Sequence, residues 1–154
     1  MCLQTLDLSC NNIATIQGLD HLPLRELNLA HNKIRELTGL NTLVNLTALD
    51  ASYNLVMHLA PLQQCMELSY INLAHNFIPF IRHVEFLTNL PWLQTLLLCD
   101  NPCQQKEQYR LRVIFRLCNL IKLDHSNVSH EEKVSYSNYN NHAILFQMLC
   151  VNVN

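Results

Sequence analysis

Residues 24–43 read LRELNLAHNKIRELTGLNTL, and this stretch decides the fold. Leu27 and Leu29 alternate with polar neighbours, and a period of two is typical of a strand with one buried face. After Asn32 the apolar residues recur at every third position: Ile34, Leu37, Leu40 and Leu43. Three residues per turn suits a 3₁₀ turn better than an α-helix. The stretch therefore predicts one strand followed by a tight return.

The same pattern recurs along the chain, with copies that begin at Leu3, Leu24, Leu46, Leu68 and Leu93, or 21, 22, 22 and 25 residues apart. Each copy carries an asparagine at one fixed position: Asn11, Asn32, Asn54, Asn76 and Asn101. A single coil cannot bury its leucines, so neighbouring coils must stack and share a core. We expect the asparagines to satisfy backbone groups where the chain turns inward. Residues 1–100 are thus predicted to form a solenoid.

Residues 101–133 break the pattern and predict a cap that follows a last partial repeat. Tyr109, Val113, Ile114 and Leu117 share one face of an expected helix, and a short strand-like run follows over residues 120–124. A solenoid that simply stops would expose its apolar core, so a cover with a polar outer face is expected here. Residues 134–154 are Asn-rich and then apolar, and we interpret them as an atypical tail.

The repeat resembles the leucine-rich-repeat superfamily, in its short 22-residue intracellular subclass. The segment after the repeats resembles the C-terminal cap of that superfamily, whose pattern matches Tyr109-Arg110, Leu123-Asp124 and Glu131-Glu132. Cys118 departs from the pattern, since the family usually has proline there. The resemblance implies an α/β fold, a leucine-rich-repeat solenoid with a curved parallel sheet and short 3₁₀ or helical returns, closed by a helical cap.

Residues 99–117, CDNPCQQKEQYRLRVIFRL, together with EEKVS at 131–135, are similar to the leucine-rich repeat and guanylate kinase domain family. The likeness spans about residues 3–135 and concerns only the repeat part, because the kinase domain would lie beyond this chain. It implies a role in the assembly of a sperm flagellum or cilium. Since residues 1–2 lead straight into a full repeat, we expect the end of a longer array, either a fragment or a shortened isoform.

The composition narrows the class of protein. Of the 154 residues 49% are hydrophobic and 14% are charged, so a buried core is expected and bulk disorder is not. The formal charge of −2 argues against electrostatic capture of nucleic acid or an anionic membrane. Neither a signal peptide nor a membrane-spanning stretch is evident. Seven scattered cysteines favour free thiols. We expect a cytoplasmic protein, with the cilium, flagellum or cytoskeleton as its site and the nucleus as the alternative.

The sequence lacks the residues that an enzyme site, a cofactor site or a metal site would need. A phosphate-binding loop needs several glycines and a lysine, yet the sequence has only Gly18 and Gly39. His31 and His75 share a repeat position but lie two coils apart, roughly 9–10 Å, which is too far for one zinc ion. A Cys10–His31 pair would lack a third, orienting group. We predict no enzyme activity, no cofactor, no metal and no small-molecule substrate.

The informative surface is the exposed face of the predicted sheet, here called the concave face. Residues that flank the buried strand leucines form columns along it, and we predict that these columns bind another protein. Tyr53 and Tyr70 are of the type enriched at binding hot spots, and the acidic residues favour a partner with a basic segment. The candidate binding residues are Asp7, Glu26, Asn28, Asp50, Tyr53, Tyr70, Asn72 and His75.

Two alternatives remain open from the sequence. The chain could be the targeting module of a guanylate-kinase-like protein whose catalytic domain is absent here. It could instead be a ribonucleoprotein component that uses its cap, because residues 101–133 carry six Lys and Arg against four Asp and Glu, whereas residues 1–100 carry four against eight. A solvated helix face explains the same cations more simply. Nucleic acid is therefore disfavoured as a partner.

Overall fold

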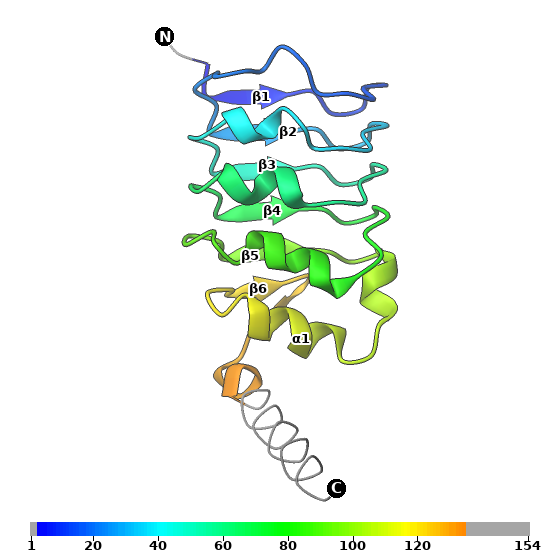
Figure 1. Cartoon of the computed structure of the whole chain (residues 1–154), viewed down its shortest axis with the longest axis vertical. Coiled ribbons are helices and arrows are strands. Elements are labelled where there is room, and N and C mark those ends of the chain that lie inside the picture. Colours follow the sequence, from blue (N-terminus) through cyan, green and yellow to red (C-terminus); the bar gives the residue numbers. More distant parts are fainter. Residues whose placement is uncertain (1–2, 135–154) are drawn as a thin grey trace, which may run out of the picture.

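A computed structural model describes residues 3–134 of the chain. Short strands alternate with short 3₁₀ helices, an α-helix follows the last complete repeat, and a further helical segment begins at His130 (Figure 1). The strands are β1 (Thr5–Asp7), β2 (Glu26–Asn28), β3 (Ala48–Asp50), β4 (Tyr70–Asn72), β5 (Thr95–Leu97), β6 (Lys122–Leu123) and β7 (Ser126–Asn127). The helices are η1 (Leu40–Thr42), η2 (Ala60–Gln64), η3 (Ile81–Leu87), η4 (Pro102–Gln105) and α1 (Tyr109–Arg116).

Within the described residues all strands form one sheet in chain order, β1 to β7. The strands from β1 to β6 pair in parallel, and each repeat is in register with the next, so that Leu27 faces Leu49 and Leu49 faces Ile71. β7 turns back and pairs with β6 in the antiparallel sense. The 3₁₀ returns lie on one side of this sheet, as Figure 1 shows. The predicted leucine-rich-repeat solenoid is confirmed.

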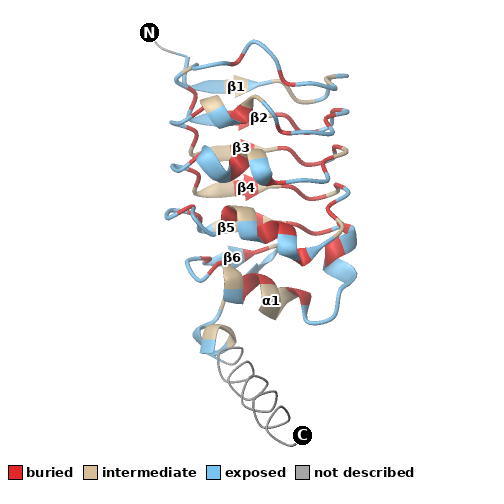
Figure 2. Cartoon of the chain, viewed as in Figure 1, coloured by how far each residue is buried: buried red, intermediate tan, exposed pale blue. Residues whose placement is uncertain are grey.

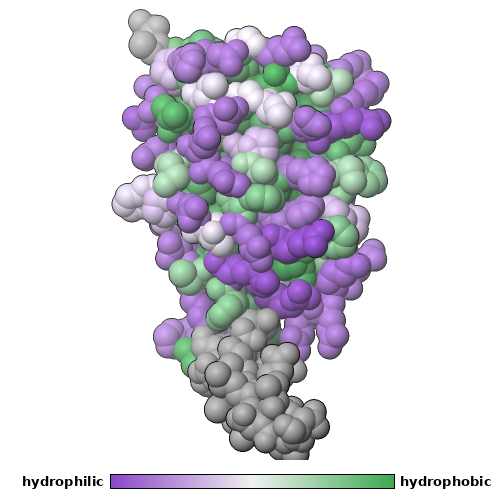
Figure 3. All heavy atoms as spheres, in the orientation of Figure 1, coloured by the Kyte–Doolittle hydropathy of each residue, from purple (hydrophilic) through white to green (hydrophobic). Residues whose placement is uncertain are grey.

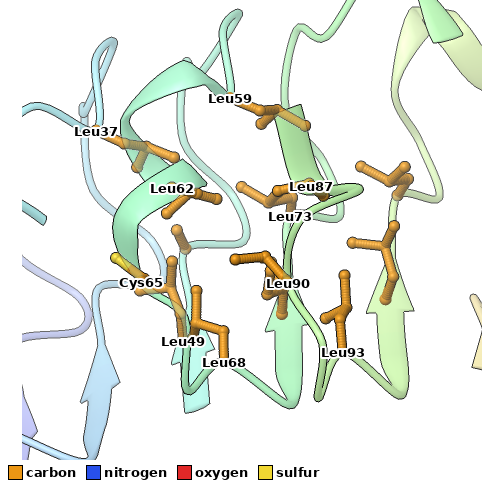
Figure 4. Packing of buried hydrophobic residues seen from close by; sticks show 14 of the residues in the cluster. Leu37, Leu49, Leu59, Leu62, Cys65, Leu68, Leu73, Leu87, Leu90 and Leu93 are labelled. Carbon is orange, nitrogen blue, oxygen red and sulfur yellow. The ribbon is translucent and has the colours of Figure 1, made fainter. Parts of the chain in front are cut away.

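The core lies between the sheet and the returns, where buried residues run the length of the stack (Figure 2). Leu49 on β3, Leu62 on η2 and Leu73 after β4 are each 0% exposed and belong to one continuous cluster (Figure 4). Cys65 packs among these leucines as a small apolar residue and is also 0% exposed. The apolar residues that recur at every third position of the sequence are thus those that the returns direct at the core.

The repeated asparagines connect neighbouring coils through their side-chain amides. Asn54 donates from Nδ2 to the carbonyl oxygen of Leu29 on the preceding coil at 2.9 Å, and its Oδ1 accepts from the backbone N–H of Ile34 at 2.9 Å. Asn32, Asn76 and Asn101 make the same kinds of bond. Asn11 is exposed and bonds only within its own coil, to Leu8 and Ser9. The buried members therefore satisfy backbone groups that would otherwise lack partners.

The cap covers the last repeat with α1 and the β6–β7 hairpin. Tyr109 is buried, and its hydroxyl donates to Asp124 Oδ2 at 3.1 Å. The other oxygen of Asp124 accepts from the backbone N–H of Leu98 at 2.7 Å, which ties the hairpin to the end of the repeats. Burial of the phenol, followed by the nearby Asp124 carboxylate, raises the pKa of Tyr109. The phenol therefore stays protonated and can act as a donor.

The first coil is less buried than the coils that follow it. Leu3 is 52% exposed, and Leu6 and Leu8 are only partly buried, whereas Leu27 and Leu49 are buried. The atypical tail predicted over residues 134–154 lies outside the described residues, apart from Val134. Across residues 3–134, every helix is too short or too polar to cross a membrane.

Candidate protein-binding surface

The parallel register places the predicted binding residues in columns on the concave face. One column joins Thr5, Glu26, Ala48, Tyr70 and Thr95, and the next joins Asp7, Asn28, Asp50, Asn72 and Leu97. The middle residue of each strand from β1 to β5 is directed at the core, so these flanking residues point away from it. The sequence order alone therefore brings Glu26, Asp50 and Tyr70 onto neighbouring strands.

A groove of about 190 Å³ crosses the first four strands of this face. Asp7, Glu26 and Asp50 line it with three carboxylates, and Tyr70 lines the same groove. The small side chain of Ala48 lies between the columns of Glu26 and Tyr70. None of these three carboxylates forms an ion pair in the described part of the chain. The groove is therefore an acidic hollow with an aromatic residue at one side.

Local hydrogen bonds hold two of the acidic side chains in place. Asp50 Oδ1 accepts from the backbone N–H of Ser52 at 2.9 Å and from its hydroxyl at 2.6 Å, while Asp50 Oδ2 accepts from Asn72 Nδ2 at 2.9 Å. Asp7 accepts in the same way from the N–H of Ser9, and the hydrogen bonds with Ser9 lower the pKa of Asp7. Burial, with Asp50 nearby, raises the pKa of Tyr70. The two aspartates are thus oriented before any partner arrives.

A ring stack borders this face just past the strands. His31, Tyr53 and His75 occupy one repeat position and have positive φ of 55°, 52° and 53°. The rings of His31 and Tyr53 lie 4.2 Å apart and those of Tyr53 and His75 lie 4.0 Å apart, both nearly parallel. His75 Nε2 is 3.2 Å from Asp100 Oδ2, at the same position of the next repeat. Sequence reasoning found this column but missed the stack, whose only signal is the run of ring residues at one position.

The ring of Tyr53 also separates His31 from His75, so the two imidazoles lie on opposite sides of it. In the described residues no group of three or more His, Cys, Asp and Glu side chains gathers as a metal site would require. Cys99 and His125 approach to 3.5 Å between Sγ and Nε2, and this pair belongs to no such group within residues 3–134.

The cap residues act on structure rather than on the concave face. Arg110 donates from Nε to Glu132 Oε1 at 2.6 Å and from Nη1 to the carbonyl oxygen of Leu123 at 3.1 Å. Arg116 pairs with Glu85 on η3 at 3.3 Å. The expectation of a simply solvated basic helix face is therefore wrong for these two arginines, because α1 packs beside η3 and beside the chain near Glu132.

The sequence matches the family model described as "Leucine-rich repeat" over residues 4–143, and the chain belongs to the leucine-rich repeat family. It is 38% identical over 156 residues to leucine-rich repeat-containing protein 23 of Xenopus tropicalis, covering 85% of this chain and 45% of that protein. It is 32% identical over 111 residues to cilia- and flagella-associated protein 410 of Mus musculus, covering 71% of this chain and 45% of that protein. The chain thus spans about half the length of these relatives.

Solved structures share the fold. An internalin of Listeria monocytogenes superimposes with a TM-score of 0.61 at 25% identity, over 86% of this chain and 44% of the internalin. A chain of the Drosophila melanogaster SNF/U2A′ complex superimposes with a TM-score of 0.56 at 24% identity, over 94% and 74%. The second likeness shows the fold alone. The resemblance to the guanylate kinase domain family stays a prediction from the sequence.

Proposed function

We propose that this chain is a non-catalytic scaffold that binds a basic segment of another protein along its concave face, in a cilium or flagellum. The acidic groove beside Tyr70 carries this proposal. The three carboxylates have no cationic partner in the part of the chain that the structure describes. They therefore favour a basic ligand and speed its approach by electrostatic attraction. Tyr70 supplies contact area near the middle of the array, where surrounding residues can exclude water.

The names of the relatives support the location. One relative is called a cilia- and flagella-associated protein, which agrees with the flagellar role implied by the sequence resemblance. Leucine-rich-repeat arrays build extended surfaces for recognition, and this supports protein binding as the general activity. The same surface would serve a targeting module of a guanylate-kinase-like protein, which is the alternative. A role in a ribonucleoprotein through the basic cap is less favoured, because Arg110 and Arg116 of the cap are already paired with Glu132 and Glu85.

The test compares variants of the groove with matched variants elsewhere. The chain is used to capture partners from ciliated cells, and the recovered partner is then titrated against each variant. Tyr70→Ala should weaken binding by about 2 kcal/mol or more if Tyr70 is a hot spot. Asp50→Asn should slow association at low salt, because it removes charge but retains an oxygen that can accept from Ser52.

Trp92→Ala and Glu36→Arg serve as controls, since both residues are exposed and lie outside the groove. Both controls should bind as the wild type does. A recovered partner that binds Tyr70→Ala and Asp50→Asn with wild-type affinity would overturn the concave-face proposal. Loss of binding in the controls alone would place the interface on the returns instead.

A further inference from the structure

A second hollow lies on the face that carries the helical turns, between η3 and the cap. It has a volume of about 180 Å³ and is lined by Phe80, Ile81, Arg82, Lys106 and Arg112. Strongly hydrophilic side chains gather over this part of the surface, near η3 and α1 (Figure 3). These residues come from two segments that are well separated in the sequence. The concave face and its groove involve none of them.

Three of the five lining residues are cations without an ion-pair partner among residues 3–134. The ion pairs of the described residues join Arg110 to Glu132, Arg116 to Glu85 and His75 to Asp100. Arg82, Lys106 and Arg112 take part in none of them. The basic residues of α1 thus divide into two that hold the cap together and one, Arg112, that lines the hollow and forms no ion pair with any residue from 3 to 134. Such a concentration of cations attracts anions into the pocket.

The pocket is also partly preorganised. The guanidinium of Arg82 lies 4.5 Å from the centroid of the Phe80 ring, a cation–π contact that restricts the arginine. Arg116 fixes α1 against η3 through Glu85 and donates to the carbonyl oxygen of Arg112 at 3.1 Å. Ile81 is only 2% exposed and forms an apolar base. The elements η3 and α1, which carry Arg82 and Arg112, are therefore joined to each other beside the pocket.

We propose that this pocket binds the phosphate monoester of a phosphorylated serine side chain on a partner protein. Two guanidinium groups and an ammonium group can donate several charge-assisted hydrogen bonds to a compact dianion, and arginine forks match phosphate geometry. Phe80, which is 46% exposed, provides an apolar wall for the carbon that bears the phosphate. A long polyanion fits less well, because the chain has a net charge of −2 and an acidic concave face.

The experiment titrates the ¹⁵N-labelled chain at physiological salt and follows the arginine Nε–H signals. The probes are N-acetyl-phosphoserine amide, N-acetylserine amide, inorganic phosphate and a short single-stranded RNA. Phosphoserine amide should shift the signals of Arg82 and Arg112, while the unphosphorylated compound should shift neither. The double variant Arg82→Gln/Arg112→Gln should bind phosphoserine amide at least tenfold more weakly. Arg35→Gln should bind as the wild type does, since Arg35 is exposed, as Arg82 is, and lies outside the pocket.

Three results would overturn the proposal. The first is an absence of shifts with phosphoserine amide, and the second is equal loss of affinity in Arg35→Gln, which would indicate nonspecific charge attraction. The third is binding of inorganic phosphate or of a single-stranded RNA more tightly than phosphoserine amide, which would assign the pocket to free phosphate or to RNA. Amide spectra of the double variant that match those of the wild type elsewhere will show that the variant is folded.

Discussion

The imidazole of His75 stacks on the phenol ring of Tyr53, with 4.0 Å between ring centroids and 16° between their planes. His31 stacks on the other side of the same phenol at 4.2 Å. Tyr53 therefore joins three successive coils at the edge of the concave face, although it is 46% exposed. The backbone permits the arrangement because all three residues adopt the left-handed conformation at the same point of the repeat.

Replacing Tyr53 with Ala should remove both stacking contacts. Aromatic pairs contribute about 0.5–1.5 kcal/mol each beyond the area that they bury, so the loss of two pairs should lower the free energy of unfolding by about 1–3 kcal/mol. The ring protons of His31 and His75 should also move downfield, because they lose the shielding of the phenol. Tyr53→Phe should retain both stacking contacts. If the histidine signals stay in place in Tyr53→Ala, the stack does not exist in solution.

Asn76 tests the role of the buried asparagines. It donates to the carbonyl oxygen of Ala51 at 2.9 Å, and its Oδ1 accepts from the N–H of Val56 at 2.9 Å. Asn76→Ala leaves such buried groups unpaired at about 1–3 kcal/mol each, so urea denaturation should show a loss of several kcal/mol. Asn11→Ala should cost less than about 1 kcal/mol, because Asn11 is exposed and serves only its own coil. Equal losses for both would contradict the inter-coil role.

The cysteines should differ sharply in reactivity. Burial raises the pKa of Cys65 and of Cys103 to about 11, and both side chains are 0% exposed, whereas Cys10 and Cys118 are exposed. Because the thiolate is the nucleophile, iodoacetamide at a pH of about 8 should modify Cys10 and Cys118 quickly and the buried pair only after unfolding. Peptide mass spectrometry over a time course measures this. Rapid native alkylation of Cys65 would contradict its place in the core.

The apolar repeat could be predicted from the sequence because the same requirement for burial recurs in every coil. Leu49, Ile71 and Cys65 all occupy places that a stacked coil must bury, and the structure buries them. The fold follows from that requirement alone. The columns of the concave face follow as well, because a parallel register with a fixed repeat leaves no freedom in which strand residues become neighbours.

Features that depend on side-chain directions between distant segments could not be predicted in this way. Arg110 resembles any solvated arginine in the helix sequence, and only the return of the chain brings Glu132 to it. The pocket at Arg82 and Arg112 likewise arises from the packing of α1 beside η3, which the broken periodicity after Asn101 does not specify. Such contacts can be predicted only when the geometry of the cap is known, whereas the repeats can be predicted from their period alone.

The ion pair between Arg110 and Glu132 makes the stability of the cap depend on pH. Glu132 accepts from Arg110 Nε at 2.6 Å and from the backbone N–H of Ser129 at 2.9 Å. The hydrogen bond from Arg110 is the largest cause that lowers the pKa of Glu132 in the folded chain. The ionised carboxylate of Glu132 therefore stabilises the folded chain above the ordinary glutamate pKa of about 4.3. This stabilisation is lost as the pH falls through the lower pKa that Glu132 has in the folded chain.

Glu132→Gln should accordingly destabilise the chain by about 1 kcal/mol at neutral pH, because the pair is partly exposed and solvent screens it. The difference in the free energy of unfolding between the variant and the wild type should shrink as the pH falls below the ordinary glutamate pKa and through the lower value of the folded chain, where the wild-type carboxyl also becomes neutral. Urea denaturation at neutral, mildly acidic and strongly acidic pH measures this difference in the free energy of unfolding. Glu67→Gln is the control, since Glu67 is exposed and forms no ion pair in the described residues. A loss of stability in Glu132→Gln that is the same at every pH would mean that shape, and not the charge on Glu132, holds the segment at Glu132 to α1.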